Sequence, residues 1–275
     1  MLLELHCHSS CSRGKKIPAE GIGSPAEIVR AAKRLGLDGI ALTDHITSRG
    51  WKEAGEEAKK QGLAFIPGIE ISSLGGHVIG LGLNGHIESG LSLEETLEKI
   101  REQGAVSVAA HPFDLRREGT GKNAAKADVI EAFNSMNLEI LSNRLAGRLA
   151  KREGKPSVGG SDSHTPAMLG ACPNELDAHD LDSCLKEIKA GRVSFRPRYI
   201  PLEDLISWTR QRFSLSHADV LKYIEANYWQ PKKWVSQRML HVFLDSRREW
   251  PWQLLGGFGI RSSQAYGLLR AFTSD

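Results

Sequence analysis

"SPAEIVRAAKRLGLDGIALTDH", residues 24–45, has a helix signal at each end and continues into an apolar, β-branched run. Ser24 and Pro25 are typical of an N-cap and a first helical position, because the hydroxyl accepts from a free backbone N–H and proline lacks that group. Gly36 stands where such a helix would end in a left-handed residue. The run "GIALTDH" (39–45) then predicts a strand with Asp44 and His45 at its end. This stretch is therefore expected to form one helix followed by one strand.

The same pattern recurs through residues 1–198. A capping box of Ser92 and Glu95 begins another helix, and further glycines stand at the expected helix ends, namely Gly62, Gly104, Gly154 and Gly191. Strands alternating with helices through short connections predict a parallel sheet, and seven such units predict a closed (β/α)7 barrel. The other six strand-like runs are "LLELHCH" (2–8), "LAFIPGIEIS" (63–72), "HVIGLGL" (77–83), "AVSVAAHP" (105–112), "VIEAFN" (129–134) and "PSVGGSDSH" (156–164).

Histidines and acids gather at the ends of these runs. Nearly all of them fall on the carboxyl side of their strand, where a barrel of this kind builds its active site. The exception is His77, which begins its run. The set is His6, His8, Asp44, His45, Glu70, His77, His111, Asp162 and His164. The convergence of six imidazoles and three acids on one rim favours a metal site over a purely structural role.

Each member alone allows a simpler interpretation. His6 and His8 share a strand face, yet two such histidines often make only ordinary hydrogen bonds. Asp44 could cap the loop that follows its strand, His77 could bond a neighbouring strand, and His111 could simply end a strand before Pro112. The remaining histidines are expected at the surface, away from the rim: His86, His179, His217 and His241.

A donor set of this size is too rich for one tetrahedral ion. Glu70 is the natural bridging ligand, because a carboxylate has two oxygens and an imidazole offers one nitrogen. Two metals roughly 3.5–4 Å apart can polarise a phosphoryl oxygen, generate hydroxide near neutral pH and stabilise the leaving oxygen. Phosphoester hydrolysis needs all three effects, and amide hydrolysis or deamination ranks second.

The ordered motifs identify a family. "HxHSxxS" (6–12), "LTDH" (42–45), "PGIEIS" (67–72), "HVIGLG" (77–82), "AHPF" (110–113) and "GSDSH" (160–164) together resemble the polymerase and histidinol phosphatase (PHP) family over residues 1–198. The resemblance implies a distorted seven-stranded barrel with a trinuclear site of zinc, manganese or iron. It also implies hydrolysis of phosphoesters, with histidinol phosphate, nucleotides and oligonucleotides among the family's substrates.

The resemblance also implies a ligand set. A first metal would be held by His6, His8, Glu70 and Asp162; a second by Glu70 and His111, with His77 as a further ligand; and a third by His45 and His164. His164 and Arg13 are the candidate catalytic residues.

The chain departs from the family pattern at one position. Arg13 stands where an Asp or His is usual, so the third site would be weaker, completed by water, or supplied by Glu20. Arg13 could instead bind a substrate phosphate, since a guanidinium matches phosphate oxygens, or could simply face solvent. The same alternatives apply to Lys15 and Lys16.

Residues 199–275 are expected to form a separate helical region. Residues 200–275 contain ten Lys/Arg against seven Asp/Glu, and five of the six tryptophans: Trp208, Trp229, Trp234, Trp250 and Trp252. Tryptophans beside cations could stack on single-stranded bases, which would favour a nuclease. The alternative is that these rings pack on the barrel or form a dimer interface.

The composition narrows the class of protein. The 275 residues are 40% hydrophobic and 25% charged, as in an ordinary globular protein. We expect a cytoplasmic location, no membrane association and reduced thiols at the four cysteines, with Cys7 pointing away from its flanking histidines. The expected substrate is a phosphorylated small molecule or a nucleotide. A nuclease acting on single strands and a non-catalytic metal-binding scaffold are the alternatives.

Overall fold

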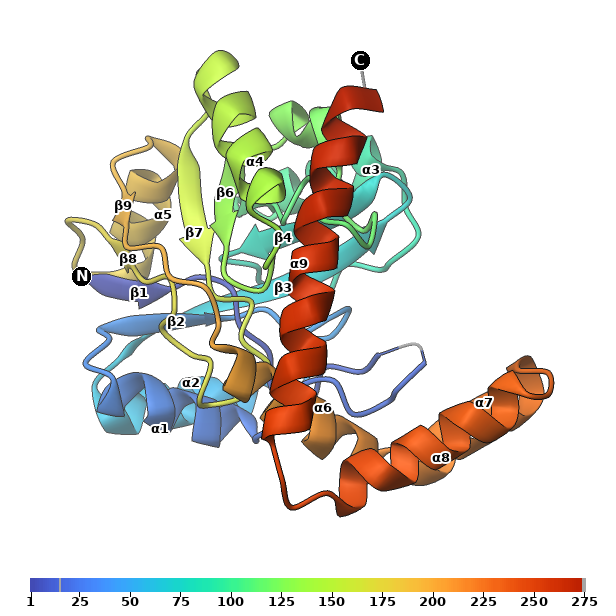
Figure 1. The fold of residues 1–275 in the computed structure, drawn as a ribbon. Helices are drawn as coiled ribbons and strands as arrows, with labels where there is room; N and C mark the ends of the chain where they lie inside the picture. The colour runs from blue at the N-terminus through green and yellow to red at the C-terminus, as the bar shows by residue number, and fades with distance from the viewer. Residues whose placement is uncertain (15, 274–275) are drawn as a thin grey trace.

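The computed structural model describes residues 1–14 and 16–273, and within them all seven expected runs form strands. Two further strands of two residues each, β8 (Asn174–Glu175) and β9 (Ser194–Phe195), extend the sheet, whose order over the described residues is β7-β6-β5-β4-β3-β2-β1-β8-β9. The sheet curls into a nearly closed barrel with helices outside it (Figure 1). The seven strands are β1 (Leu2–Glu4), β2 (Gly39–Leu42), β3 (Ala64–Ser73), β4 (Gly76–Leu81), β5 (Val106–Ala109), β6 (Val129–Asn134) and β7 (Ser157–Gly160).

The prediction of a wholly parallel sheet is wrong at β4. This strand pairs antiparallel with both β3 and β5, and only Leu74 and Gly75 connect it to β3. Two residues cannot form the crossover that a parallel pair requires, so the chain makes a hairpin instead. The reversal brings the start of β4, where His77 pairs with Ser72, to the rim formed by the carboxyl ends of the neighbouring strands. This reversal explains why His77 reaches the rim although it stands at the start of its strand-like run.

The barrel closes through a side chain as well as through backbone. The carboxamide of Asn174 accepts from the Gly159 backbone N–H (2.9 Å) and donates to the Gly159 carbonyl (2.7 Å), as a paired strand would. Beyond β7, the Ser163 carbonyl accepts from the His8 backbone N–H (2.8 Å), and Cys7 and Ser163 form a parallel bridge. These contacts bring the segment after β7 beside the segment after β1.

The two helix starts and five helix ends that the sequence indicates are all present. The capping boxes Ser24–Glu27 and Ser92–Glu95 both form, and the five glycines expected at helix ends all have positive φ. The helices around the barrel are α1 (Pro25–Arg34), α2 (Trp51–Gln61), α3 (Leu93–Glu102), α4 (Ile140–Arg152) and α5 (Leu181–Lys189), with a short 3₁₀ segment at Gly121–Lys126.

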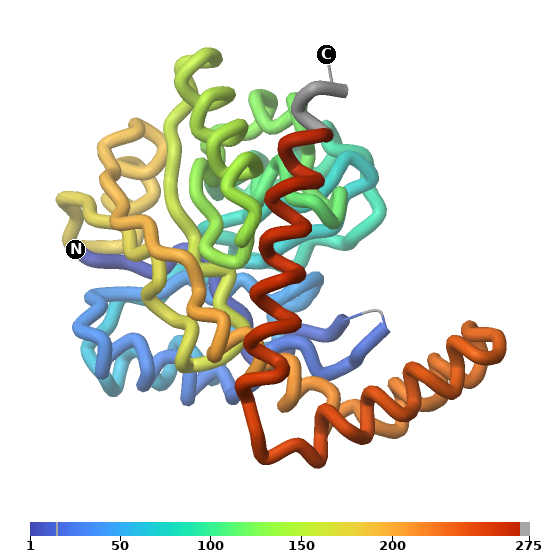
Figure 2. Tube along the Cα trace, in the orientation of Figure 1, coloured from blue at the N-terminus to red at the C-terminus, as the bar shows by residue number. Residues whose placement is uncertain are grey.

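The C-terminal part of the chain is helical, as expected. It comprises α6 (Leu202–Leu215), α7 (His217–Asn227), α8 (Lys232–Asp245) and α9 (Trp250–Thr273). Helices α7 and α8 form a hairpin that projects from the barrel, whereas α9 runs back along α6 and α4 (Figure 2). Gln264 of α9 ties it to the barrel by donating to the Leu138 carbonyl at 2.7 Å. Among the described residues, none of these helices combines the length and apolarity that crossing a bilayer requires.

Candidate metal centre

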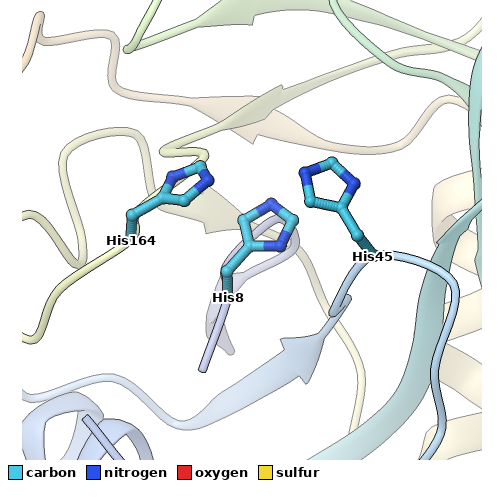
Figure 3. Close-up of side chains that lie close together, drawn as sticks. All are labelled: His8, His45 and His164. Carbon is cyan, nitrogen blue, oxygen red and sulfur yellow. The ribbon is translucent and has the colours of Figure 1, made fainter. Parts of the chain in front are cut away.

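The eight residues proposed as metal ligands meet at one rim of the barrel. His6, His8, Glu70, His111, Asp162 and His164 are almost fully buried, and His45 and His77 are partly exposed. The rings are close: His8 lies 4.6 Å from His45 and 4.4 Å from His164 between centroids. Figure 3 shows these three imidazoles side by side on three separate segments of the chain. The convergence expected from the strand ends is therefore present.

Glu70 is the centre of the cluster. Its Oε1 lies 2.9 Å from His77 Nδ1 and 2.9 Å from His111 Nε2. Its Oε2 lies 3.1 Å from His45 Nδ1, 3.3 Å from His8 Nε2 and 3.4 Å from His6 Nε2. A carboxylate with both oxygens surrounded by imidazole nitrogens is the arrangement in which one ligand is shared between ions.

Within the described residues, three groups of donors bring one atom from each member within 4.8 Å of the others. The first matches the expected first site: His6, His8, Glu70 and Asp162. The second joins Glu70 and His77 with His45, and the third joins His45 and His164 with His8. His111 lies outside these groups, but His77 Nδ1 and His111 Nε2 each lie 2.9 Å from Glu70 Oε1. Which residues bind which ion stays a prediction.

The charges of the cluster suit bound cations. Burial alone would raise the pKa of Glu70 and Asp162, but the surrounding imidazoles outweigh it and hold both pKa values well below the usual range. Burial lowers the pKa of His45 to about 3 and that of His164 well below its usual value, so both rings are neutral and can donate a lone pair. At His6, His8 and His111 burial also lowers the pKa, but the neighbouring carboxylates outweigh it and raise the pKa, to about 9 at His111, so these rings release protons when a cation binds. Buried carboxylates require positive charge nearby. Divalent metals that accept nitrogen and oxygen donors, such as zinc, manganese and iron, would provide it.

One buried atom independently supports this fit. The Nδ1 atom of His111 has no hydrogen-bond partner among the described residues, although the residue is 2% exposed. Buried imidazole nitrogens are normally paired, so an orphaned Nδ1 on the ring whose Nε2 contacts Glu70 is consistent with a further group that binds to this ring. The residues present therefore fit a centre with more than one metal ion.

A buried acid that we did not predict orients this cluster. Glu131 of β6 accepts from His6 Nδ1 (2.8 Å), from the His111 backbone N–H (2.6 Å) and from Asn134 Nδ2 (3.0 Å). It thereby directs Nε2 of His6 toward Glu70, which is how outer residues fix a ligand's tautomer. Gly160 of β7 makes room, because a Cβ there would lie 1.9 Å from Glu131 Oε1. The sequence feature that could have revealed Glu131 is that a single acid stands within the apolar run "VIEAFN".

The substitution Glu131→Gln is expected to weaken metal binding and activity by about 10–100-fold. All three neighbours of Glu131 donate hydrogen bonds, so an amide NH₂ would oppose at least one of them. Metal titration of stripped protein measures the change, and Glu153→Gln at the exposed end of α4 is the matched control. Equal affinities for wild type and Glu131→Gln would show that Glu131 does not orient the ligands.

The loop after β1 is also built around the ligands. Asp44 accepts from both the backbone N–H (2.6 Å) and the hydroxyl (2.7 Å) of Ser9, so it caps the loop after β1 rather than the loop after its own strand, which the simpler interpretation expected. Ser12 Oγ lies 3.0 Å from His8 Nδ1 and accepts from the His45 backbone N–H at 2.8 Å.

Cys7 faces the opposite side, with its thiol 3.2 Å from the Ala41 carbonyl. The four cysteines are free in the described part of the chain.

Helix α6 reaches the same rim, which the sequence did not indicate. The Trp208 ring lies 4.8 Å from that of His164, and its indole N–H donates to the Glu20 carbonyl (2.8 Å). The Arg212 guanidinium lies 4.5 Å above the Trp208 ring and donates to the Ala19 carbonyl (3.0 Å). Glu20 Oε2 is 3.7 Å from His45 Nε2, so the side chain suggested for the third site does lie beside it. The barrel and α6 therefore build this part of the rim together.

A cleft of about 330 Å³ opens at His45 and His77. Three cations and two acids line it, along with apolar side chains; the cations are Arg13, Lys16 and Arg212 and the acids Glu20 and Glu118. Arg13 and Lys16 are exposed, and Lys15 lies outside the described residues. A cleft with several cations beside a carboxylate–imidazole cluster suits an anionic substrate.

A barrel with these donors at its rim and a cationic cleft beside them defines the class of metal-dependent hydrolases. The PHP domain model matches residues 4–140, and the PHP-associated model matches residues 141–193. The chain therefore belongs to the PHP family, and it is a metal-dependent phosphoesterase.

Individual proteins are similar to parts of this chain. An uncharacterized protein of Methanocaldococcus jannaschii is 37% identical over 153 residues, which cover 53% of this chain and 89% of that protein. A 5'-3' exoribonuclease of Haemophilus influenzae is 35% identical over 38% of this chain, and a 3',5'-nucleoside bisphosphate phosphatase of Chromobacterium violaceum is 36% identical over 39%. The matches cover only 37% and 39% of those two enzymes.

The fold has counterparts among solved structures. A two-domain protein of Bacteroides vulgatus that contains a predicted PHP-like metal-dependent phosphoesterase superposes with a TM-score of 0.58 at 20% identity. The superposition covers 78% of this chain and 69% of that one. At this identity the likeness concerns the fold alone.

Proposed function

We propose that this protein hydrolyses a phosphomonoester, such as a nucleotide or a phosphorylated metabolite, at a site of two or three divalent ions. The observation that carries the proposal is the position of Glu70, whose two carboxylate oxygens are approached by five imidazoles among the described residues. One carboxylate shared in this way suits adjacent ions, and adjacent ions suit phosphoryl chemistry.

The residues have distinct roles in this proposal. His6, His8, His45, Glu70, His77, His111, Asp162 and His164 hold the ions, which when bound would activate water and stabilise the charge that develops on the phosphoryl group. His164 donates from Nδ1 to the Asp162 carbonyl (2.8 Å), which leaves Nε2 free to bind a cation or accept a proton. Arg13, at the mouth of the cleft, pairs with the phosphate oxygens.

A nuclease acting on single strands is the second candidate. The exoribonuclease relative favours it, and so do Trp229 and Trp234, which are 71% and 63% exposed on the projecting hairpin. Exposed tryptophans can stack on bases. Trp208, by contrast, packs against the barrel, as the simpler interpretation of these rings expected. A cleft of about 330 Å³ is better matched to a small ester than to a strand.

The deciding assay compares a chromogenic phosphomonoester with single-stranded RNA, with chelator and with added manganese. We expect hydrolysis of the monoester that chelator abolishes and manganese restores, together with weak RNA binding at physiological salt. Cleavage of RNA with steep salt dependence and no monoesterase activity would instead support the nuclease.

A further inference from the structure

A second cavity lies on the C-terminal helices, next to the cleft. It has a volume of about 350 Å³, and its walls come from α6, α7 and α8 and from the loop after β1. Its lining is mainly apolar and aromatic and includes Phe213, Tyr223, Tyr228, Ile224 and Met239. This is the composition of a small-molecule pocket, in which apolar walls carry a few polar groups.

The loop after β1 is fixed against these helices. Ile17 packs on the buried cluster of Val220, Ile224 and Leu240. The Ala19 backbone N–H donates to Ser216 Oγ at 2.9 Å. Contacts between segments about 200 residues apart therefore form the cavity, and a barrel without the C-terminal helices would lack it.

The cavity and the cleft share Lys16 and Ile17. They differ in chemistry, since the cleft contains the cations and the metal-facing histidines whereas the cavity contains aromatic rings. Phe213 of the cavity follows Arg212 of the cleft on α6. A ligand with an anionic end and a flat apolar end matches this order of surfaces.

We propose that this cavity is a second subsite, which binds a flat ring system of the kind a nucleobase presents while the phosphate occupies the cleft. The inference rests on the proposed phosphomonoesterase function. Tyr223 and Tyr228 contact each other edge to face with centroids 6.0 Å apart, and Phe213 adds a third ring. Aromatic faces bind bases without strong sequence preference, so the subsite would select nucleoside phosphates as a class over phosphates that lack a base.

The test compares AMP with ribose 5-phosphate, which has the same phosphate and sugar but no base. Ser236→Trp places an indole in the cavity, and Tyr223→Ala removes an aromatic wall without adding bulk. Val235→Trp is the matched control, because Val235 is exposed on the same helix and lies outside the lining. Manganese-loaded protein is used throughout, with kcat and KM measured separately.

We expect wild type to favour AMP, and Ser236→Trp and Tyr223→Ala to lower kcat/KM for AMP by about tenfold, mainly through KM. The kcat/KM for ribose 5-phosphate should change less than twofold in every variant. Val235→Trp should have wild-type kcat/KM for both esters. If the cavity variants changed kcat/KM equally for the two esters, or left kcat/KM for AMP unchanged, the subsite would be overturned. The phosphomonoesterase function would still stand. If wild type hydrolysed a chromogenic phosphomonoester but not AMP, the subsite alone would be overturned, whereas failure on all three esters would overturn the phosphomonoesterase function as well.

Discussion

Glu70→Gln is expected to lower kcat/KM for a phosphomonoester by at least about 1,000-fold, because several kcal/mol of metal-dependent stabilisation would be lost. The amide preserves the shape of the side chain but removes its charge and presents NH₂ to a cluster of ring nitrogens. His77 and His111 contact one oxygen and His6, His8 and His45 the other, so neither orientation of the amide satisfies the set.

The measurement pairs steady-state kinetics with metal analysis of the same preparation. Glu88→Gln, in the exposed loop after β4, is the matched control and should retain wild-type values. Circular dichroism establishes that both variants fold. A folded Glu70→Gln protein with wild-type metal content and turnover would contradict the shared-carboxylate arrangement.

Asp162→Asn is expected to remove nearly all activity, with a loss on the order of 1,000-fold. Asp162 Oδ1 lies 3.1 Å from His8 Nε2, and Oδ2 accepts from Asn134 Nδ2 at 3.2 Å. An amide oxygen carries no full charge and is a much weaker metal ligand. An amide nitrogen on the other side would oppose the Asn134 donor.

Asparagine is the appropriate replacement because the backbone at this position is unusual. Asp162 has φ +50°, a left-handed conformation that Asn tolerates well and Ala does not. Asp162→Asn therefore isolates the carboxylate charge, whereas Asp162→Ala adds backbone strain. If Asp162→Ala lowered thermal stability while Asp162→Asn kept full activity, Asp162 would be a structural residue rather than a metal ligand.

Much of the barrel could be predicted because its signals are local. Apolar runs marked all seven strands from β1 to β7, and Ser24, Ser92 and the helix-ending glycines marked helix ends through contacts within four residues. The direction of β4 was missed because strand periodicity is the same in either direction, although the short Leu74-Gly75 connection contained the information. Strands β8 and β9 have two residues each, too few for any periodicity.

The candidate site, too, could be predicted only in part from the sequence. Its residues could be identified because strand ends of a barrel meet at one rim, and all eight lie there. Which residues share an ion depends on how far each side chain reaches across the rim, and that assignment stays a prediction. The role of α6 was hidden because its contacts join residues about 190 positions apart, as between Trp208 and Glu20.

The expected boundary near residue 198 falls between β9 and α6, where the strands end. The helices beyond it nevertheless contact the loop after β1 through Trp208, Arg212 and Ser216. Whether residues 199–275 fold as a separate unit stays a prediction. Their contacts show that the barrel and α6 form this part of the rim together.

Metal content of the purified protein, measured alongside turnover of a chromogenic phosphomonoester with and without manganese, tests the central claim most directly. We predict two or three divalent ions per chain, loss of both metal and turnover on chelation, and recovery of turnover with manganese. Folded protein that binds no divalent metal under any of these conditions would contradict it.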